Sequence, residues 1–164
     1  MKQKARILTA EPGKQELVLA KEFNAPRELV FKAYTDPSLY VKWIGPRRLT
    51  TAIETFTARN GGSWRFIQKD KDGNEYAFHG VFHEVLVPSR IIMTWEYEGL
   101  PETGHVSLQS ATFENLPGGK TRFTAKVVYL SLDDRDGELQ AGMEEGLNES
   151  YERLDELLDE LKKG

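Results

Sequence analysis

Hydrophobic and polar residues alternate along most of the chain between Arg48 and Leu130, and this period of two is typical of strands with one buried face. Turn signals rich in Gly, Asn, Asp or Pro interrupt the alternation at hairpin spacing, the first of them at residues 60–62. Strands joined by such short turns pair with their sequence neighbours in antiparallel order. The pattern therefore predicts six strands, over residues 49–57, 63–69, 75–85, 90–97, 106–114 and 120–130.

A further strand and two short helices are predicted before this meander. Residues 15–23 form a strand-like run, and Pro26 suits the first turn of a helix whose apolar residues recur at helical spacing as far as Thr35. Asp36 is placed to cap a second short helix, which ends at Gly45. We expect these two helices to close one open end of the sheet.

A long amphipathic helix is predicted at the end of the chain, over residues 136–162. Its apolar stripe follows i, i+3, i+4 spacing, whereas the opposite face is almost wholly acidic and is best explained as a solvated surface. At about 1.5 Å per residue the helix is long enough to cross the whole sheet. The stripe consists of Met143, Leu147, Tyr151, Leu154, Leu158 and Leu161.

Together these elements predict one α+β domain over residues 15–164, preceded by a flexible segment over residues 1–14. A curved antiparallel sheet wraps the C-terminal helix, because that helix is the only element large enough to cover the buried face of the sheet. Alternating large aromatic residues suggest deep curvature, and we expect small residues to leave room in the gap: Gly80, Gly142 and Gly146. The prediction is an apolar cavity of ligand size between sheet and helix.

Composition and charge exclude several classes of protein. A chain of 164 residues with 39% hydrophobic and 29% charged residues has the make-up of one globular domain, and no stretch approaches the ~18 unbroken apolar residues of a membrane span. The start of the chain lacks the apolar run of a secretory signal, so we expect a cytoplasmic protein. With no cysteine, the fold has no disulfide and no thiolate metal site.

Charge is distributed unevenly along the chain. From Asp133 onward there are 12 acidic and 4 basic residues, a formal charge of −8, which leaves +4 for residues 1–132 out of the total of −4. Neither part has the clustered basic and aromatic residues of a nucleic-acid surface, so no nucleic acid and no membrane insertion are expected.

Four motifs occur in order along the chain, and their sequence letters are FNAPRELVF at 23–31, TDP leading to KW at 35–43, GGSWRF at 61–66, and GVFHEV at 80–85 followed by TW at 94–95. Their order and spacing resemble the family related to the C-terminal domain of the ATPase activator of heat-shock protein 90, within the helix-grip superfamily of START lipid-transfer domains and polyketide cyclases (SRPBCC). The resemblance runs from about residue 15 to residue 161. It implies a β-α-α-β6-α topology with a deep hydrophobic cavity.

The histidines do not form a metal site. His79 and His83 have a spacing that provides two ligands on a helix, but on a strand residues four apart lie about 13 Å from each other. No metal and no cofactor are therefore predicted. The chain also lacks the GxSxG, P-loop and dinucleotide-binding motifs of common enzyme classes.

The aromatic residues are the main functional signal, because small-molecule sites combine apolar walls with a few polar groups. Each aromatic residue alone is well explained by core packing, but as a set they favour a ligand site when combined with the cavity that the resemblance implies. Arg65 and Gln68 are candidate polar contacts near its mouth. The predicted ligand-binding residues are Trp43, Trp64, Phe66, Gln68, Tyr76, Phe78, Trp95, Met143, Leu147 and Tyr151.

Three functions follow from these signals. The leading hypothesis is binding of a small hydrophobic, lipid-like or polycyclic molecule without chemistry. The second is an enzyme or a sacrificial resistance protein acting on a polyketide-like compound, with His79, Glu84 or Tyr151 as acid or base. The third, implied by the resemblance, is a co-chaperone of a heat-shock protein 90-type chaperone. The sequence leaves two possible protein partners open: a chaperone, or a second copy of the chain in a homodimer.

Overall fold

The computed structural model describes residues 6–164, and within them the strands form one eight-stranded antiparallel sheet in the order β1-β2-β8-β7-β6-β5-β4-β3. Strands β3 to β8 are a meander of hairpins, and β2 is placed beside β8 at the other side. The strands are β1 (Leu8–Thr9), β2 (Glu16–Phe23), β3 (Thr50–Phe56), β4 (Ser63–Lys69), β5 (Glu75–Leu86), β6 (Arg90–Tyr97), β7 (Val106–Leu116) and β8 (Lys120–Tyr129).

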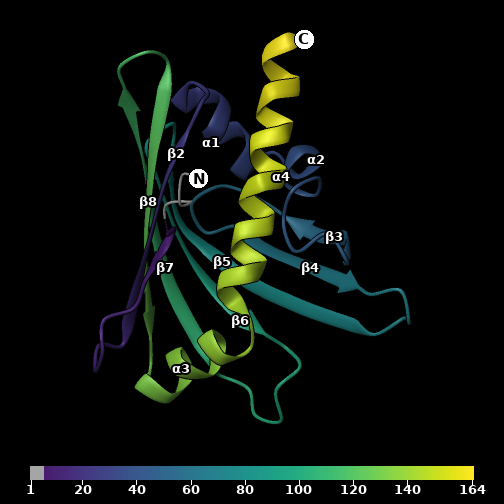
Figure 1. The fold of residues 1–164 in the computed structure, drawn as a ribbon. Helices are drawn as coiled ribbons and strands as arrows, with labels where there is room; N and C mark the ends of the chain where they lie inside the picture. The colour runs from purple at the N-terminus through teal and green to yellow at the C-terminus, as the bar shows by residue number, and fades with distance from the viewer. Residues whose placement is uncertain (1–5) are drawn as a thin grey trace, which may run out of the picture.

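Helices lie on the concave side and at the two ends of this sheet, as Figure 1 shows. The long helix α4 runs across the concave side, the short helices α1 and α2 lie toward its upper end, and α3 lies at its lower end. The predicted α+β fold, with a curved antiparallel sheet around a long C-terminal helix, is therefore confirmed. The helices are α1 (Arg27–Thr35), α2 (Pro37–Tyr40), α3 (Leu132–Gln140) and α4 (Met143–Lys163).

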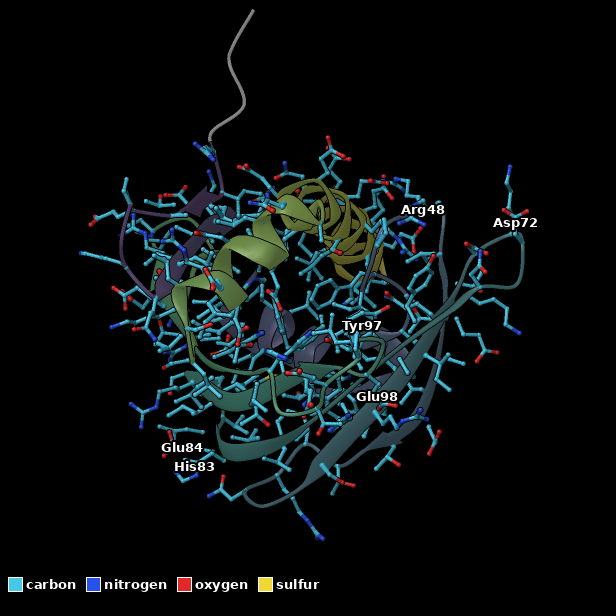
Figure 2. All side chains as sticks on the ribbon, turned by 90° about the horizontal axis from the view of Figure 1, so that it is seen from below. Arg48, Asp72, His83, Glu84, Tyr97 and Glu98 are labelled. Atoms are coloured by element: carbon cyan, nitrogen blue, oxygen red, sulfur yellow. The ribbon has the colours of Figure 1, made fainter. Side chains whose placement is uncertain are left out.

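The sheet has an inner face toward α4 and an outer face toward solvent. Side chains alternate between these faces, so on β8 Phe123, Ala125, Val127 and Tyr129 are buried while the residues between them are more exposed. Figure 2 looks along the curled sheet and shows Tyr97 on the side of the helices and its neighbour Glu98 on the outside. The two faces therefore offer surfaces of different chemistry.

The core lies where the middle of α4 meets aromatic side chains of the sheet and of the segment after α2. The Tyr151 ring centroid is 5.9 Å from those of Phe23 and Phe123, and 6.4 Å from that of Trp43. Leu154, one turn further along α4, is completely buried. Aromatic edge contacts of this kind add to the stabilisation that comes from burying their area.

The segment before β2 is more ordered than expected. We predicted a flexible segment over residues 1–14, but Leu8 and Thr9 form β1, which pairs with Leu19 and Val18 of β2. Leu8 is only 1% exposed and belongs to the core. The prediction failed because two residues are too few to give a strand pattern, and residues 1–5 lie outside the described part of the chain.

The single C-terminal helix predicted over residues 136–162 is also wrong, since two helices occupy this region. Helix α3 begins earlier, where the Ser131 hydroxyl accepts a hydrogen bond from the Asp134 amide. The chain then turns at Gly142, whose φ of 89° lies in the left-handed region that glycine adopts at little cost. This turn changes the chain direction, so α3 lies across the lower end of the sheet instead of extending α4 (Figure 1).

We expect Leu8→Ala to lower the free energy of unfolding by about 2–3 kcal/mol, because the substitution leaves a cavity under a buried side chain. Urea unfolding followed by circular dichroism measures this change. Leu130→Ala is the matched control, since Leu130 is 70% exposed and its truncation should change stability by less than about 0.5 kcal/mol. Equal, negligible effects of both substitutions would mean that β1 is not docked in solution.

Candidate ligand site on the inner face

Five of the predicted ligand-binding residues belong to the packed core: Trp43, Trp64, Phe66, Gln68 and Tyr151. All five are at most 5% exposed. These residues therefore pack the core, which is the explanation favoured by the sequence for each aromatic residue taken alone. The Trp43 indole N–H also donates a 3.0 Å hydrogen bond to the Ala33 carbonyl oxygen, which fixes the segment after α2 against α1.

Gln68 has a structural role that its predicted position near a cavity mouth did not suggest. Its Nε2 donates to Thr51 Oγ1 at 3.3 Å and to the Ile44 carbonyl oxygen at 3.5 Å. A Cβ at Gly45 would lie 2.2 Å from the same Nε2, so the glycine permits this close approach. Gln68 thus holds the connection between α2 and β3 onto the inner face.

The other five predicted residues are only partly buried: Tyr76, Phe78, Trp95, Met143 and Leu147. Tyr97 joins them, because its ring centroid lies 5.1 Å from that of Phe78, which in turn is 5.4 Å from that of Trp95. We call these six residues the open inner face. They come from β5 and β6 on the sheet side and from the first turns of α4 on the helix side.

Helix α4 covers the inner face unequally along its length. Its buried residues all lie between Ser150 and Leu158, whereas Met143 and Leu147 in the first two turns stay partly exposed. A Cβ built at Gly142 or Gly146 would meet no atom within 4 Å, consistent with the expectation that these glycines leave room. The aromatic side chains of β5 and β6 are therefore only partly covered.

Gly80, in contrast, does not leave room. A Cβ at this position would lie 2.0 Å from the Thr94 carbonyl oxygen and 2.6 Å from the Trp64 indole nitrogen. The space that we assigned to a ligand is thus filled by the Trp64 ring and the neighbouring strand. That indole nitrogen is buried without a hydrogen-bond partner among the described residues.

Arg65 lies on the outer face, whereas Gln68, with which we grouped it, lies on the inner face. Its guanidinium binds both carboxylate oxygens of Glu98 at 2.9 Å and also pairs with Glu54. These hydrogen bonds, with the nearby guanidinium charge, lower the pKa of the Glu98 carboxyl. A groove of about 660 Å³ lies beside this cluster, and its lining includes Arg65 and His79 together with Trp64 and Tyr97.

The candidate acids and bases are not brought together. His79 Nδ1 lies 2.9 Å from Glu98 on the outer face, and Glu84 pairs with Arg90 at 2.6 Å at the outside of the curl (Figure 2). Tyr151 is in the core, where burial raises the pKa of its hydroxyl. The three residues therefore do not form an acid–base arrangement on one surface.

Within residues 6–164, no group of three or more His, Asp or Glu side chains is arranged to hold a metal ion. No helix in the same range is long and apolar enough to cross a membrane.

One polar pair on the inner side was missed by sequence reasoning. The Tyr129 hydroxyl donates to Glu138 Oε2 and lies 3.7 Å from Met143 Sδ, so the carboxylate of α3 sits beside the start of α4. Burial raises the pKa of the Glu138 carboxyl, while the Tyr129 hydrogen bond opposes this shift. We had assigned the whole acidic face to solvent, and Glu138 is the exception because α3 is turned away from the α4 axis.

The family model described as Activator of Hsp90 ATPase homolog 1-like protein matches residues 24–159. No curated protein matches the sequence. Among solved structures, a Rhodobacter sphaeroides protein is similar at 25% identity with a TM-score of 0.82, covering 92% of this chain and 97% of that chain.

Two further solved structures are similar over nearly their whole length. A Mycobacterium smegmatis protein is 26% identical with a TM-score of 0.82, covering 92% of this chain and 94% of that chain. A Nitrosomonas europaea protein is also 26% identical, with a TM-score of 0.78, covering 93% of this chain and 99% of that chain. These similarities support the family match and the helix-grip fold.

Two glycine substitutions should have opposite effects on stability. We expect Gly80→Ala to destabilise the fold by about 1–3 kcal/mol, because the new methyl group overlaps backbone and the Trp64 ring. Gly146→Ala is the matched control and should stabilise by up to about 1 kcal/mol, since it adds a better helix former in open space. Thermal unfolding of both variants tests this, and a tolerated Gly80→Ala would contradict the close packing.

The stability effect of Glu138→Gln should depend on pH. A carboxyl whose pKa is raised on folding binds more protons in the folded state, so its ionisation destabilises the fold as pH rises through the folded pKa. The glutamine variant has no such proton to lose. Its free energy of unfolding should therefore rise relative to the unmodified protein as pH increases from the ordinary glutamate value of 4.5 toward 7. Urea unfolding across this range measures the difference, and a constant difference would contradict the raised pKa.

Proposed function

We propose, because the chain belongs to the family of Activator of Hsp90 ATPase homolog 1-like proteins, that it binds a small, mainly apolar molecule at the open inner face. In this proposal the protein binds without carrying out chemistry on its ligand. The ligand lies between the first two turns of α4 and the aromatic side chains of β5 and β6.

The unequal cover provided by α4 is the observation that carries this proposal. An inner face that were simply a core would be buried along the whole helix, as it is from Ser150 to Leu158. Instead, Phe78, Trp95 and Leu147 keep contact with water although they pack against the core. Covering them with a ligand would gain about 25 cal/mol for each Å² of apolar surface removed from water.

The chemistry of this surface favours a ligand with a rigid or aromatic body. Rings on β5 and β6 lie at centroid distances of 5.1 to 5.4 Å from one another, a spacing typical of aromatic contacts. Met143 adds a flexible thioether that adapts to irregular shapes. The buried members of the predicted set, such as Trp43 and Trp64, support the floor of the site and need not touch the ligand.

We expect the purified protein to retain small apolar molecules after incubation with a bacterial lipid extract, detected by native mass spectrometry. Leu147→Glu should reduce retention at least about tenfold, because it places a charge on the apolar wall. Leu108→Glu is the matched control, since Leu108 is 47% exposed on the outer face and its substitution should leave retention unchanged.

Thermal unfolding of both glutamate variants separates lost binding from lost folding. An unmodified protein that retains nothing, or a folded Leu147→Glu variant that retains as much as the unmodified protein, would contradict ligand binding at this surface.

A co-chaperone role is the second candidate, and the outer face supports it. Val81 is 50% exposed and Leu108 47%, and Leu108 pairs directly with the exposed Val128 of β8. Exposed apolar side chains in one row are a surface that a protein partner would cover. Stimulation of the ATPase of the cognate chaperone, abolished by Leu108→Glu but not by Leu147→Glu, would support this function over ligand binding.

An enzymatic or sacrificial reaction with a polyketide-like compound has the weakest support. His79 and Glu84 are engaged with charged partners on the outside of the sheet, and Tyr151 is enclosed in the core. None of the three lies in the open inner face where the ligand is proposed to bind.

A further inference from the structure

The open inner face ends at a carboxylate. Glu138 is half-buried on α3, and its Oε2 accepts a hydrogen bond from Tyr129, an inner-face residue that is itself buried. Met143, a member of the open inner face, lies 3.7 Å from the same tyrosine oxygen through its sulfur atom. Glu138 is therefore adjacent to the apolar surface proposed to hold the ligand.

This carboxylate has no cation beside it. Within residues 6–164, Glu98 and Glu84 pair with arginines, whereas no Lys, Arg or His nitrogen lies within ion-pair distance of Glu138. Arg135, one turn earlier on α3, is occupied by the Glu11 carbonyl oxygen at 2.6 Å and by Asp136.

The charged group that acts on Glu138 is also negative. Asp134, on the same helix, raises the pKa of the Glu138 carboxyl and is itself paired with His105 at 2.9 Å. A partly buried negative charge without a counterion is costly, and a positively charged ligand group would remove that cost.

The register of the sheet puts the carboxylate within reach of the aromatic residues. Trp95 pairs with Ser107 on β7, and Ser107 pairs with Tyr129 on β8, so the three residues form one row across the inner face. Neighbouring strands lie about 4.8 Å apart, which places Trp95 and Tyr129 about 10 Å from each other along this row. A molecule with a bicyclic aromatic body and a two-carbon arm spans such a distance.

From this arrangement we infer that the ligand is a cationic amine on an apolar or aromatic body. The ammonium group binds the Glu138 carboxylate, which Tyr129 holds in place, and the apolar body lies against Trp95, Phe78 and Met143. This inference rests on the proposed ligand-binding function, and it adds the chemical class of the ligand. It also assigns Glu138 as the residue that selects for positive charge.

The test uses three probes that share a naphthalene body and differ at the end of the arm: 2-(2-naphthyl)ethylamine, 2-(2-naphthyl)ethanol and 2-naphthylacetate. Dissociation constants are measured at pH 7.5 by titration followed in ¹H–¹⁵N correlation spectra. We expect the amine to bind about tenfold or more tightly than the alcohol, since hydrogen bonds to charged groups are the stronger ones. The carboxylate probe should bind most weakly of the three.

Glu138→Gln should abolish the preference for the amine while leaving the affinity for the alcohol within about twofold. Glu145→Gln removes the same charge from an exposed position in the first turn of α4 and should preserve the preference. Tyr129→Phe removes the hydroxyl that holds the carboxylate in place and should reduce the preference without abolishing it, which gives a second variant if Glu138→Gln does not fold.

The outcomes separate this inference from the proposed function. Equal binding of all three probes, with no effect of Glu138→Gln, overturns the selection for amines but leaves apolar binding intact. Binding of none of the probes, together with no retention from a lipid extract, overturns both. A preference that Glu145→Gln removes as effectively as Glu138→Gln would reflect overall charge and would also overturn the inference.

Discussion

The fold depends on the contact between the middle of α4 and the aromatic cluster around Tyr151. This contact joins the last helix to β2, to β8 and to the segment after α2, so it connects parts of the chain more than 100 residues apart in sequence. Because the buried residues of the helix begin at Ser150, its first two turns stay partly exposed. The proposed binding surface therefore begins where the core ends.

The inner and outer faces of the sheet carry different kinds of side chains. On the inner face, rings and aliphatic side chains provide both the core and the surface proposed to bind a ligand. On the outer face, Arg65 neutralises part of a carboxylate-rich cluster, and exposed valine and leucine side chains offer a separate surface for a protein. Two activities on opposite faces would not compete for the same residues, and substitutions on one face report on that face alone.

Periodicity predicted the elements well because most strands are long enough to show it. The strands at residues 63–69 and 90–97 have the predicted bounds, whereas β1 has only two residues and could not be seen. Arg65 and Gln68 are three residues apart, so a strand period of two places them on opposite faces of the sheet. The sequence alone was therefore sufficient to exclude the shared role that we gave them.

The burial of individual aromatic residues could not be predicted from the sequence. Trp64 and Trp95 both lie on the inner face, yet one is buried and the other is partly exposed because of the course of α4. The packing of Trp64 over Gly80 is likewise a relation between neighbouring strands, and it turned an expected gap into a contact. Patterns along one strand contain no information about how a distant helix is tilted.

The left-handed turn at Gly142 has a consequence for the shape of the proposed binding surface. Were α3 and α4 one straight helix, Glu138 would lie nine residues, or about 14 Å, beyond Leu147 along the axis. The turn at Gly142 instead brings this carboxylate to Tyr129, which also contacts Met143, so a single glycine places a charged group at the end of the proposed binding surface. A side chain at position 142 would therefore act on ligand selectivity from a distance, by changing the direction of the chain.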